Sequence, residues 1–137
     1  MRVVIVGAGQ AGAALAAKLR ALGHQGPITM IGEEPAPPYQ RPPLSKAYLM
    51  DEMEEERLWL RAPEFYAENA IGLRLGQQVT GIDRAAKTVT VGGETIPYDH
   101  LALTTGSTPR RLPAAIGGDL PGVYTVRTLA DVDAMRA

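Results

Sequence analysis

The sequence predicts an α/β fold in which a parallel sheet carries helices and an antiparallel β region is attached to it. The first observation is that the apolar residues 3–6 run into three glycines and then into an alanine-rich stretch, which is the order strand, tight turn, helix. A second apolar strand is expected at residues 27–31. The third observation is a series of short strand-like segments in residues 72–98, with Gly92-Gly93 as a two-residue hairpin turn.

The glycines have the spacing G-x-G-x-x-G, at Gly7, Gly9 and Gly12. Gly7 lets the backbone turn sharply, Gly9 leaves room for a pyrophosphate, and Gly12 lets the helix pack closely on the strand. A phosphate would then meet the helix N-terminus, where unpaired N–H groups and the helix dipole favour an anion. Such a turn can also serve packing alone, but strand and helix flank it here in the order that nucleotide binding requires.

An acidic residue follows the second strand at the position expected for a ribose contact. Residues 11–22 form the predicted helix, Gly23 ends it, and Glu33 lies 21 residues after Gly12. A carboxylate there accepts hydrogen bonds from adenosine ribose hydroxyls. Two alternatives remain open: Glu33 is only an exposed carboxylate at a strand end, or Glu34 takes its role.

A proline-rich segment follows the second predicted strand. Residues 35–43 contain five prolines, which predicts a stiff, extended loop without regular structure. Ser45 is expected to cap a short helix that runs to Met50, and residues 63–70 to form another helix. The acidic residues between 51 and 56 are interpreted as a solvated surface, with a docking patch for a basic partner as the minor alternative.

The second half of the chain predicts mostly strands, at residues 72–75, 79–83, 88–91, 95–98 and 101–103. If the last of these lies parallel beside the first strand, Thr105 and Gly106 reach the same crevice as the glycine turn. Residues 107–122 are expected to form a loop and residues 123–126 a strand. Thr128 and Asp131 have the spacing of a capping box that opens a helix reaching residue 137.

Composition narrows the function classes. The chain has 137 residues, enough for one domain, and a net charge of −1, which argues against nucleic acid as a partner. Without cysteine there is no disulfide, no thiolate chemistry and no cysteine metal site, and His24 and His100 are interpreted as loop or strand-flank residues rather than metal ligands. No leader or membrane span is evident, so a cytoplasmic protein without a membrane partner is expected. No nucleophile–base pair is present either, which a bound redox cofactor would explain.

Four motifs carry a resemblance to a known family. They are the opening Val-Val-Ile-Val-Gly-Ala-Gly-Gln-Ala-Gly, Tyr39 with Arg-Pro-Pro-Leu-Ser-Lys at 41–46, Thr-Thr-Gly at 104–106 and Val-Arg-Thr-Leu at 126–129. Over essentially its whole length the chain resembles the N-terminal FAD-binding part of ferredoxin reductases of the putidaredoxin and rubredoxin reductase type, within the FAD-dependent pyridine nucleotide oxidoreductases. The resemblance implies an incomplete Rossmann-like fold of the three-layer ββα type.

The resemblance also implies roles for individual residues. The backbone around Ala11 and Gly12 would contact the FAD pyrophosphate, Glu33 the adenosine ribose and the Val79 backbone the adenine. Arg41 would approach the adenosine and phosphate side, and Pro43 and Leu44 would line the flavin. Lys46 would act catalytically through a hydrogen bond near flavin N5, and Arg127 would lie near the crossing into the next domain. For Lys46 the alternative is a solvated lysine, and for Arg41 a loop arginine packed on Tyr39. The full expected cofactor set comprises Gly7, Gly9, Gln10, Ala11, Gly12, Glu33, Arg41, Pro43, Leu44, Lys46, Val79, Thr105, Gly106 and Arg127.

The function that the resemblance implies is an NAD(P)H-dependent ferredoxin reductase, which passes electrons through FAD to an iron-sulfur protein. Residues 1–137 would be the N-terminal part of the FAD domain, without the NAD(P)H domain, the remainder of the FAD domain and the C-terminal interface domain. We expect this fragment alone to be inactive and to self-associate. The alternative is a non-catalytic dinucleotide-binding or regulatory module; the motif at 41–46 favours the reductase.

Overall fold

The computed structural model describes all residues 1–137, and its backbone contacts divide into two compact units. The sheet unit consists of residues Met1–Tyr39 and Trp59–Gly106, and the helical unit of residues Gln40–Leu58 and Ser107–Ala137. No helix in the structure combines the length and the apolar character needed to span a membrane.

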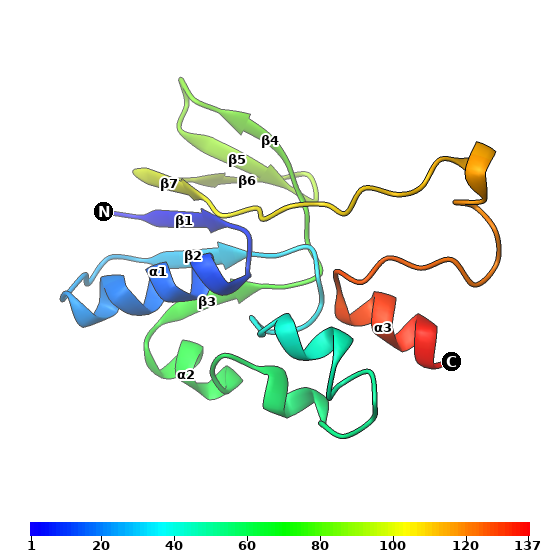
Figure 1. The fold of residues 1–137 in the computed structure, drawn as a ribbon. Coiled ribbons are helices and arrows are strands. Elements are labelled where there is room, and N and C mark those ends of the chain that lie inside the picture. Colours follow the sequence, from blue (N-terminus) through cyan, green and yellow to red (C-terminus); the bar gives the residue numbers. More distant parts are fainter. The chain divides into compact units, whose positions relative to one another are not determined.

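A four-stranded parallel sheet organises the sheet unit (Figure 1). Its strands lie in the order β3 (Ile71–Arg74), β2 (Ile28–Ile31), β1 (Val3–Val6) and β7 (His100–Leu103). The register pairs Val6 with both Ile31 and Leu103. The carboxyl ends of β1, β2 and β7 therefore meet at one edge of the sheet, as the sequence predicted for residues 101–103.

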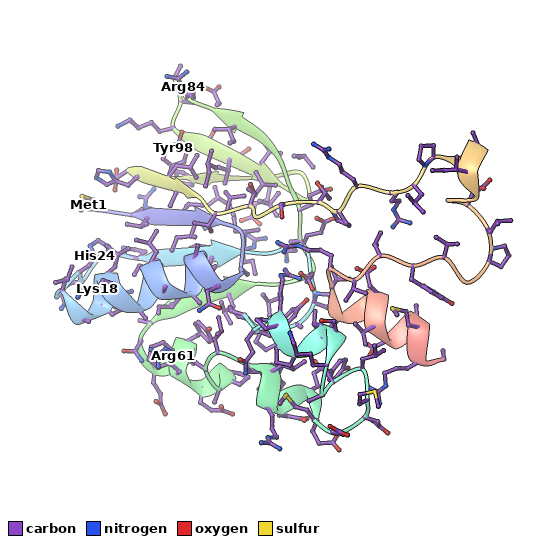
Figure 2. The ribbon with its side chains drawn as sticks, viewed as in Figure 1. Met1, Lys18, His24, Arg61, Arg84 and Tyr98 are labelled. Carbon is purple, nitrogen blue, oxygen red and sulfur yellow. The ribbon has the colours of Figure 1, made fainter.

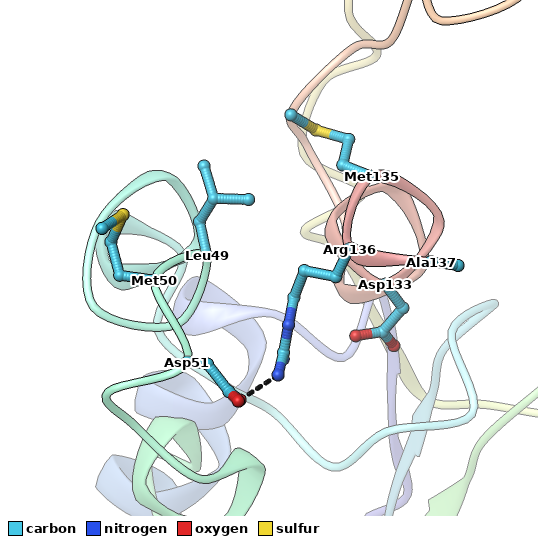
Figure 3. A pocket seen from close by; sticks show the side chains of 7 residues that line it. All are labelled: Leu49, Met50, Asp51, Asp133, Met135, Arg136 and Ala137. Carbon is cyan, nitrogen blue, oxygen red and sulfur yellow. Dashed lines mark hydrogen bonds and ion pairs between the residues drawn. The ribbon is translucent and has the colours of Figure 1, made fainter.

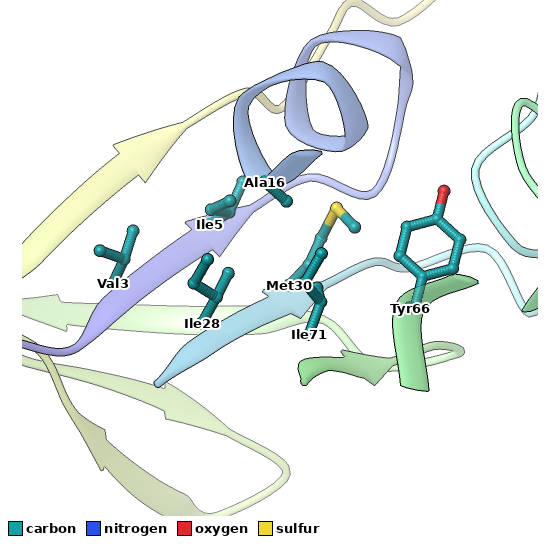
Figure 4. Close-up of a cluster of buried hydrophobic side chains, with 7 residues drawn as sticks. All are labelled: Val3, Ile5, Ala16, Ile28, Met30, Tyr66 and Ile71. Carbon is teal, nitrogen blue, oxygen red and sulfur yellow. The ribbon is translucent and has the colours of Figure 1, made fainter. Parts of the chain in front are cut away.

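Helices cover one face of this sheet. Helices α1 (Gln10–Ala21) and α2 (Pro63–Glu68) lie on the same side of it (Figure 1). Because side chains alternate along a strand, every second residue of β1 and β2 points to this face. The resulting core contains Val3, Ile5, Ala16, Ile28, Met30, Tyr66 and Ile71 (Figure 4).

A second, antiparallel sheet covers the other face. It consists of β4 (Val79–Asp83), β5 (Thr88–Val91) and β6 (Glu94–Pro97). Val4 and Ile31 of the parallel sheet pack against Val89 and Val91 of β5. Between β5 and β6, Gly92 and Gly93 both have positive φ, 56° and 82°, as the predicted two-residue hairpin turn requires. The three-layer ββα fold class is therefore confirmed.

The helical unit contains three short 3₁₀ helices and one α-helix. These are η1 (Pro42–Ser45), η2 (Glu55–Leu58), η3 (Ala114–Ile116) and α3 (Leu129–Arg136). The predicted capping box is confirmed, because the Thr128 hydroxyl accepts from the Asp131 amide and the Asp131 carboxylate accepts from the Thr128 amide. The Tyr48 hydroxyl donates to Asp133 Oδ1 of α3 at 2.8 Å, which ties the segment after η1 to this helix.

The predicted helix from Ser45 to Met50 is wrong. Pro42 and Pro43 instead start a 3₁₀ helix in which Ser45 is the last residue, and residues 46–51 form turns. Proline fixes φ near the helical value and fits the first turn of a helix, whereas Lys46 leaves the helical region at φ −135°. The proline-rich segment is therefore not irregular throughout, because its last two prolines begin η1.

The strand expected at residues 123–126 is also wrong, because these residues have no regular secondary structure. Val123, Tyr124 and Val126 are exposed, and the segment pairs with no strand. Smaller differences concern boundaries only: the third strand of the parallel sheet is Ile71–Arg74 rather than 72–75, and the helix expected over 63–70 ends at Glu68.

Candidate functional site

The glycine turn has the backbone geometry that its sequence predicted. Gly7 has φ 112°, and a Cβ there would lie 2.1 Å from the Thr104 carbonyl oxygen. A Cβ on Gly12 would lie 2.2 Å from the Gly7 carbonyl oxygen and 3.2 Å from Met30 Sδ. No side chain fits at either position, so the predicted structural roles of Gly7 in the turn and of Gly12 in helix packing are confirmed.

Helix α1 begins without a capping side chain. Gly9 is its N-cap, and the first intrahelical bond runs from the Ala13 amide to the Gly9 carbonyl at 3.0 Å. The amides of Gln10, Ala11 and Gly12 precede that bond. A Cβ on Gly9 would meet no atom within 4 Å, so open space lies over the turn. Amide donors, the positive end of the helix dipole and open space together fit a phosphate group.

The end of β2 presents Glu33 rather than Glu34. Glu33 is exposed, whereas Glu34 Oε2 accepts a hydrogen bond of 2.5 Å from the hydroxyl of buried Tyr39. Backbone bonds hold this segment in place: the Gly32 amide donates to the Arg74 carbonyl, and the Gln77 amide donates back to Gly32, both at 2.9 Å. Of the two carboxylates, Glu33 is therefore the one available for a ribose.

The end of β7 adjoins the glycine turn. The Thr104 amide donates to the Val6 carbonyl at 2.8 Å, and its hydroxyl donates to the Gly7 carbonyl at 2.9 Å. Thr105 and Gly106 follow at the same edge of the sheet and are exposed. The sequence assigned no role to Thr104; its only signal was a hydroxyl directly after a predicted strand.

The sheet unit therefore brings most of the predicted set to one edge. Val79 is the first residue of β4, in the antiparallel layer, and is half-buried. The members at the carboxyl edge of the parallel sheet are Gly7, Gly9, Gln10, Ala11, Gly12, Glu33, Thr105 and Gly106.

The other five predicted residues belong to the helical unit, and two of them are joined directly. Arg41 Nη1 donates to the Arg127 carbonyl oxygen at 2.5 Å. The Arg127 amide in turn donates to Asp131 Oδ2 at 2.8 Å. Burial acts to raise the pKa of the Asp131 carboxyl, but hydrogen bonds from the amides of Thr128 and Arg127 outweigh it and lower that pKa. An ionised Asp131 therefore holds the segment to which Arg41 is bonded.

The remaining three residues lie on or beside η1. Lys46 is exposed, and its Nζ is 3.4 Å from the Pro42 carbonyl oxygen. Pro43 is half-buried, whereas Leu44 is 2 % exposed. A contact between Leu44 and a ligand would have to be made by its backbone, because its side chain is enclosed by protein.

Both histidines lie away from this edge. His100 is the first residue of β7 and its Nε2 is 3.0 Å from Met1 Sδ, while His24 lies between α1 and β2. Figure 2 places Met1, Lys18 and His24 at the end of the sheet opposite to the glycine turn. The predicted loop position of His24 is confirmed, whereas His100 lies within β7 rather than beside a strand.

A separate hollow of about 700 Å³ lies within the helical unit (Figure 3). An ion pair between Arg136 and Asp51 spans it. Its lining consists of Leu49, Met50, Asp51, Asp133, Met135, Arg136 and Ala137. None of the predicted cofactor residues is among them, so this hollow is not the predicted site.

The chain is similar in sequence and in fold to known reductases. A family model described as "Pyridine nucleotide-disulphide oxidoreductase" matches residues 1–137. The chain is 45 % identical to rhodocoxin reductase of Rhodococcus erythropolis and 44 % identical to putidaredoxin reductase of Pseudomonas putida, covering 98 % of this chain and 32 % of each relative. Putidaredoxin reductase in its covalent complex with putidaredoxin superposes with a TM-score of 0.91 at 43 % identity, over 98 % of this chain and 33 % of that one. The chain thus spans about a third of the length of the relatives it matches.

Proposed function

Because the chain belongs to the pyridine nucleotide-disulphide oxidoreductase family, we propose that it is the N-terminal part of the FAD-binding domain of an NAD(P)H-dependent ferredoxin reductase. The observation that carries this proposal is the uncapped start of α1 behind Gly7 and Gly9, at the same sheet edge as the exposed Glu33. In open parallel sheets, ligands bind outside the carboxyl ends of the strands.

The residues of the sheet unit fit the adenosine and pyrophosphate part of a dinucleotide. The amides of Gln10 and Ala11 would donate to the pyrophosphate, and the Glu33 carboxylate would accept from the ribose hydroxyls. Thr105 and Gly106 would complete the crevice beside the turn. Val79 would contact the adenine through its backbone.

The residues of the helical unit are proposed for the flavin side. A bound flavin supplies hydride acceptance and the release of single electrons, chemistry for which this chain has no side-chain machinery of its own. Arg41, held by the Arg127 carbonyl, would provide a positive charge toward the cofactor phosphate. Lys46 would place its ammonium where negative charge develops on reduction. Pro43 would line the flavin.

The electron acceptor is proposed to be an iron-sulfur protein of the ferredoxin type. The names of the relatives support this, since one is a putidaredoxin reductase and another a rubredoxin reductase. One solved structure is a covalent complex of such a reductase with putidaredoxin. We further propose that the full-length protein adds an NAD(P)H domain, the remainder of the FAD domain and an interface domain.

The test is flavin binding by the full-length protein and by two glycine variants. Wild-type protein should purify yellow, with one FAD per chain by absorbance. Gly12→Ala should lose FAD, because its Cβ would lie 2.2 Å from the Gly7 carbonyl. Gly72→Ala is the matched control and should keep FAD, since its Cβ would meet only ordinary contacts from 3.5 Å in β3.

The outcome that overturns the proposal is wild-type protein that binds no flavin after incubation with FAD. Binding of NAD or an adenine nucleotide in its place would favour the non-catalytic module. Retention of flavin by Gly12→Ala would place the cofactor elsewhere in the protein.

A further inference from the structure

We propose that Thr104 is a positioning residue of the glycine turn: its hydroxyl holds the Gly7 carbonyl against the end of β7 and thereby orients the amides that meet the cofactor phosphate. This inference deepens the proposed function and rests on it for the identity of the cofactor. It concerns contacts within the sheet unit only.

The hydroxyl has one proton and two carbonyl oxygens within reach. Thr104 Oγ1 is 2.9 Å from the Gly7 oxygen and 3.3 Å from the Val6 oxygen. The Val6 oxygen already accepts from the Thr104 amide at 2.8 Å. The shorter contact is therefore the hydrogen bond, and the Gly7 carbonyl is the group that depends on it.

The carbonyl of half-buried Gly7 faces Gly12 in the first turn of α1. A Cβ on Gly12 would lie 2.2 Å from that oxygen and 3.0 Å from Thr104 Oγ1. A carbonyl in such a place needs a donor, because leaving it without one costs more than an average hydrogen bond contributes. Thr104, the residue directly after β7, supplies that donor from 97 residues away in the sequence.

A fixed carbonyl also fixes the amide of the next residue. The peptide bond between Gly7 and Ala8 is planar and trans, so its C=O and N–H point in opposite directions. With the carbonyl turned toward Thr104, the Ala8 amide faces away from β7, and the chain enters Gly9 and the start of α1 from a defined direction. Gly7 itself, at φ 112° and without a side chain, does little to fix the orientation of this peptide plane, so the hydrogen bond from Thr104 does so.

The test uses two substitutions at Thr104 in the full-length protein with its FAD removed. Thr104→Val keeps the shape and removes the donor, whereas Thr104→Ser keeps the donor. We expect Thr104→Val to weaken FAD binding by roughly three- to tenfold, the equivalent of one hydrogen bond. Thr104→Ser should restore affinity to within about twofold, and Kd would be measured by quenching of FAD fluorescence.

Two further measurements separate positioning from general loss of stability. Ile71→Val in β3 is the control, because it removes buried volume at the amino end of the parallel sheet, where Ile71 pairs with Ile28, and should lower Tm while leaving the FAD Kd unchanged. Hydrogen exchange of the amides of residues 8–12 in the FAD-free protein should rise in Thr104→Val and remain at the wild-type level in Thr104→Ser and Ile71→Val.

The outcomes are distinct. If wild-type protein binds FAD and Thr104→Val binds it equally well, the inference is wrong while the proposed function stands. Equal losses of affinity in Thr104→Val and Ile71→Val would show that Thr104 acts only through stability. If neither wild-type protein nor any variant binds FAD, the proposed function fails. Amide hydrogen exchange at residues 8–12 that is unchanged in Thr104→Val would then overturn the positioning role as well.

Discussion

At the scale of the residue, Glu33 is the clearest test of the adenosine side of the site. It is exposed at the end of β2, where a carboxylate can accept from a ribose. Glu33→Ala should weaken FAD binding by about 1–3 kcal/mol, the range of charge-assisted hydrogen bonds. Fluorescence titration of the FAD-free protein measures this, and unchanged affinity would remove Glu33 from the site.

Glu34→Gln is the control for that substitution. Glu34 accepts from Tyr39 and is held within the protein, so its replacement by an amide should leave FAD affinity near wild type. A larger loss in Glu34→Gln than in Glu33→Ala would reverse the assignment.

Lys46 tests the flavin side. Its ammonium is exposed, and beside the flavin it would stabilise the negative charge that reduction creates. Lys46→Met in the full-length protein should lower the flavin potential and slow reduction by NAD(P)H, while FAD stays bound. Stopped-flow reduction and potentiometry measure both effects, and Lys18→Met, on an exposed position of α1, should change neither.

The sequence predicted the roles of some residues but not the long-range hydrogen bonds of others. Gly7 and Gly12 could be assigned because backbone conformation leaves a local signature in glycine spacing. The bond from Arg41 to the Arg127 carbonyl joins residues 86 apart, and no local pattern encodes it. The hydrogen bond of the Thr104 hydroxyl could not be predicted either, because its partner, the Gly7 carbonyl, lies 97 residues away in the sequence.

At the scale of the element, the capping box of α3 makes a stability prediction. Thr128 accepts from the Asp131 amide, and Asp131 accepts from the amides of Thr128 and Arg127. Thr128→Ala should destabilise the protein by about 1 kcal/mol, the usual value of an N-cap. Urea unfolding measures the difference, and Thr128→Ser should keep most of the stability because it retains the hydroxyl.

The hydrogen bond from Tyr48, in the segment after η1, to Asp133 of α3 predicts that stability depends on alkaline pH. Burial, with a further contribution from the hydrogen bond to Asp133, raises the pKa of Tyr48 from 10.0 to about 12. A raised folded-state pKa means that the stabilisation is fully present below pH 10 and is lost as the pH rises toward 12. Tyr48→Phe should therefore be less stable than wild type at pH 8, and the difference should shrink from pH 10 to 12. A constant difference in urea unfolding across that range would contradict the role of this hydroxyl.

Elements with strong periodicity or turn signals were predicted well, and those without were not. The apolar run of β1 and the Gly92-Gly93 hairpin left clear patterns. The 3₁₀ helix at Pro42–Ser45 did not, because proline favours both extended loops and the first turn of a helix. Residues 123–126 have β-forming side chains, but a strand needs a partner, and none lies beside them.

At the scale of the whole molecule, the three layers of the sheet unit were predictable because each layer has its own local pattern. The packing of Val89 and Val91 onto Val4 and Ile31 gives the middle sheet a second covered face, which explains why β1 is apolar on both sides. The division of the chain into two units was not predicted. Each unit combines segments from distant parts of the sequence, so no single boundary in composition marks it.

The last prediction concerns what residues 1–137 do in isolation. Hydride transfer needs the nicotinamide held against the flavin at near-attack distance, and positioning of this kind contributes on the order of 7 kcal/mol or more to lowering the barrier. The chain contains one dinucleotide turn, which FAD would occupy: Gly92 and Gly93 form a hairpin, and Gly117 ends η3. We therefore expect weak FAD binding or none, and no NADH oxidation above that of free flavin.

The same isolated chain should also self-associate. Strand β7 is an edge of the parallel sheet, with Leu103 61 % exposed, and the segment around η3 exposes Ile116 at 68 %. Open strand edges and apolar surfaces invite pairing with a second chain. Light scattering should give a mass above that of the monomer, falling when Leu103→Lys places a charge at the edge. Steady-state NADH oxidation with added FAD completes the test, because robust turnover by a monomeric chain would show that residues 1–137 hold a complete active site.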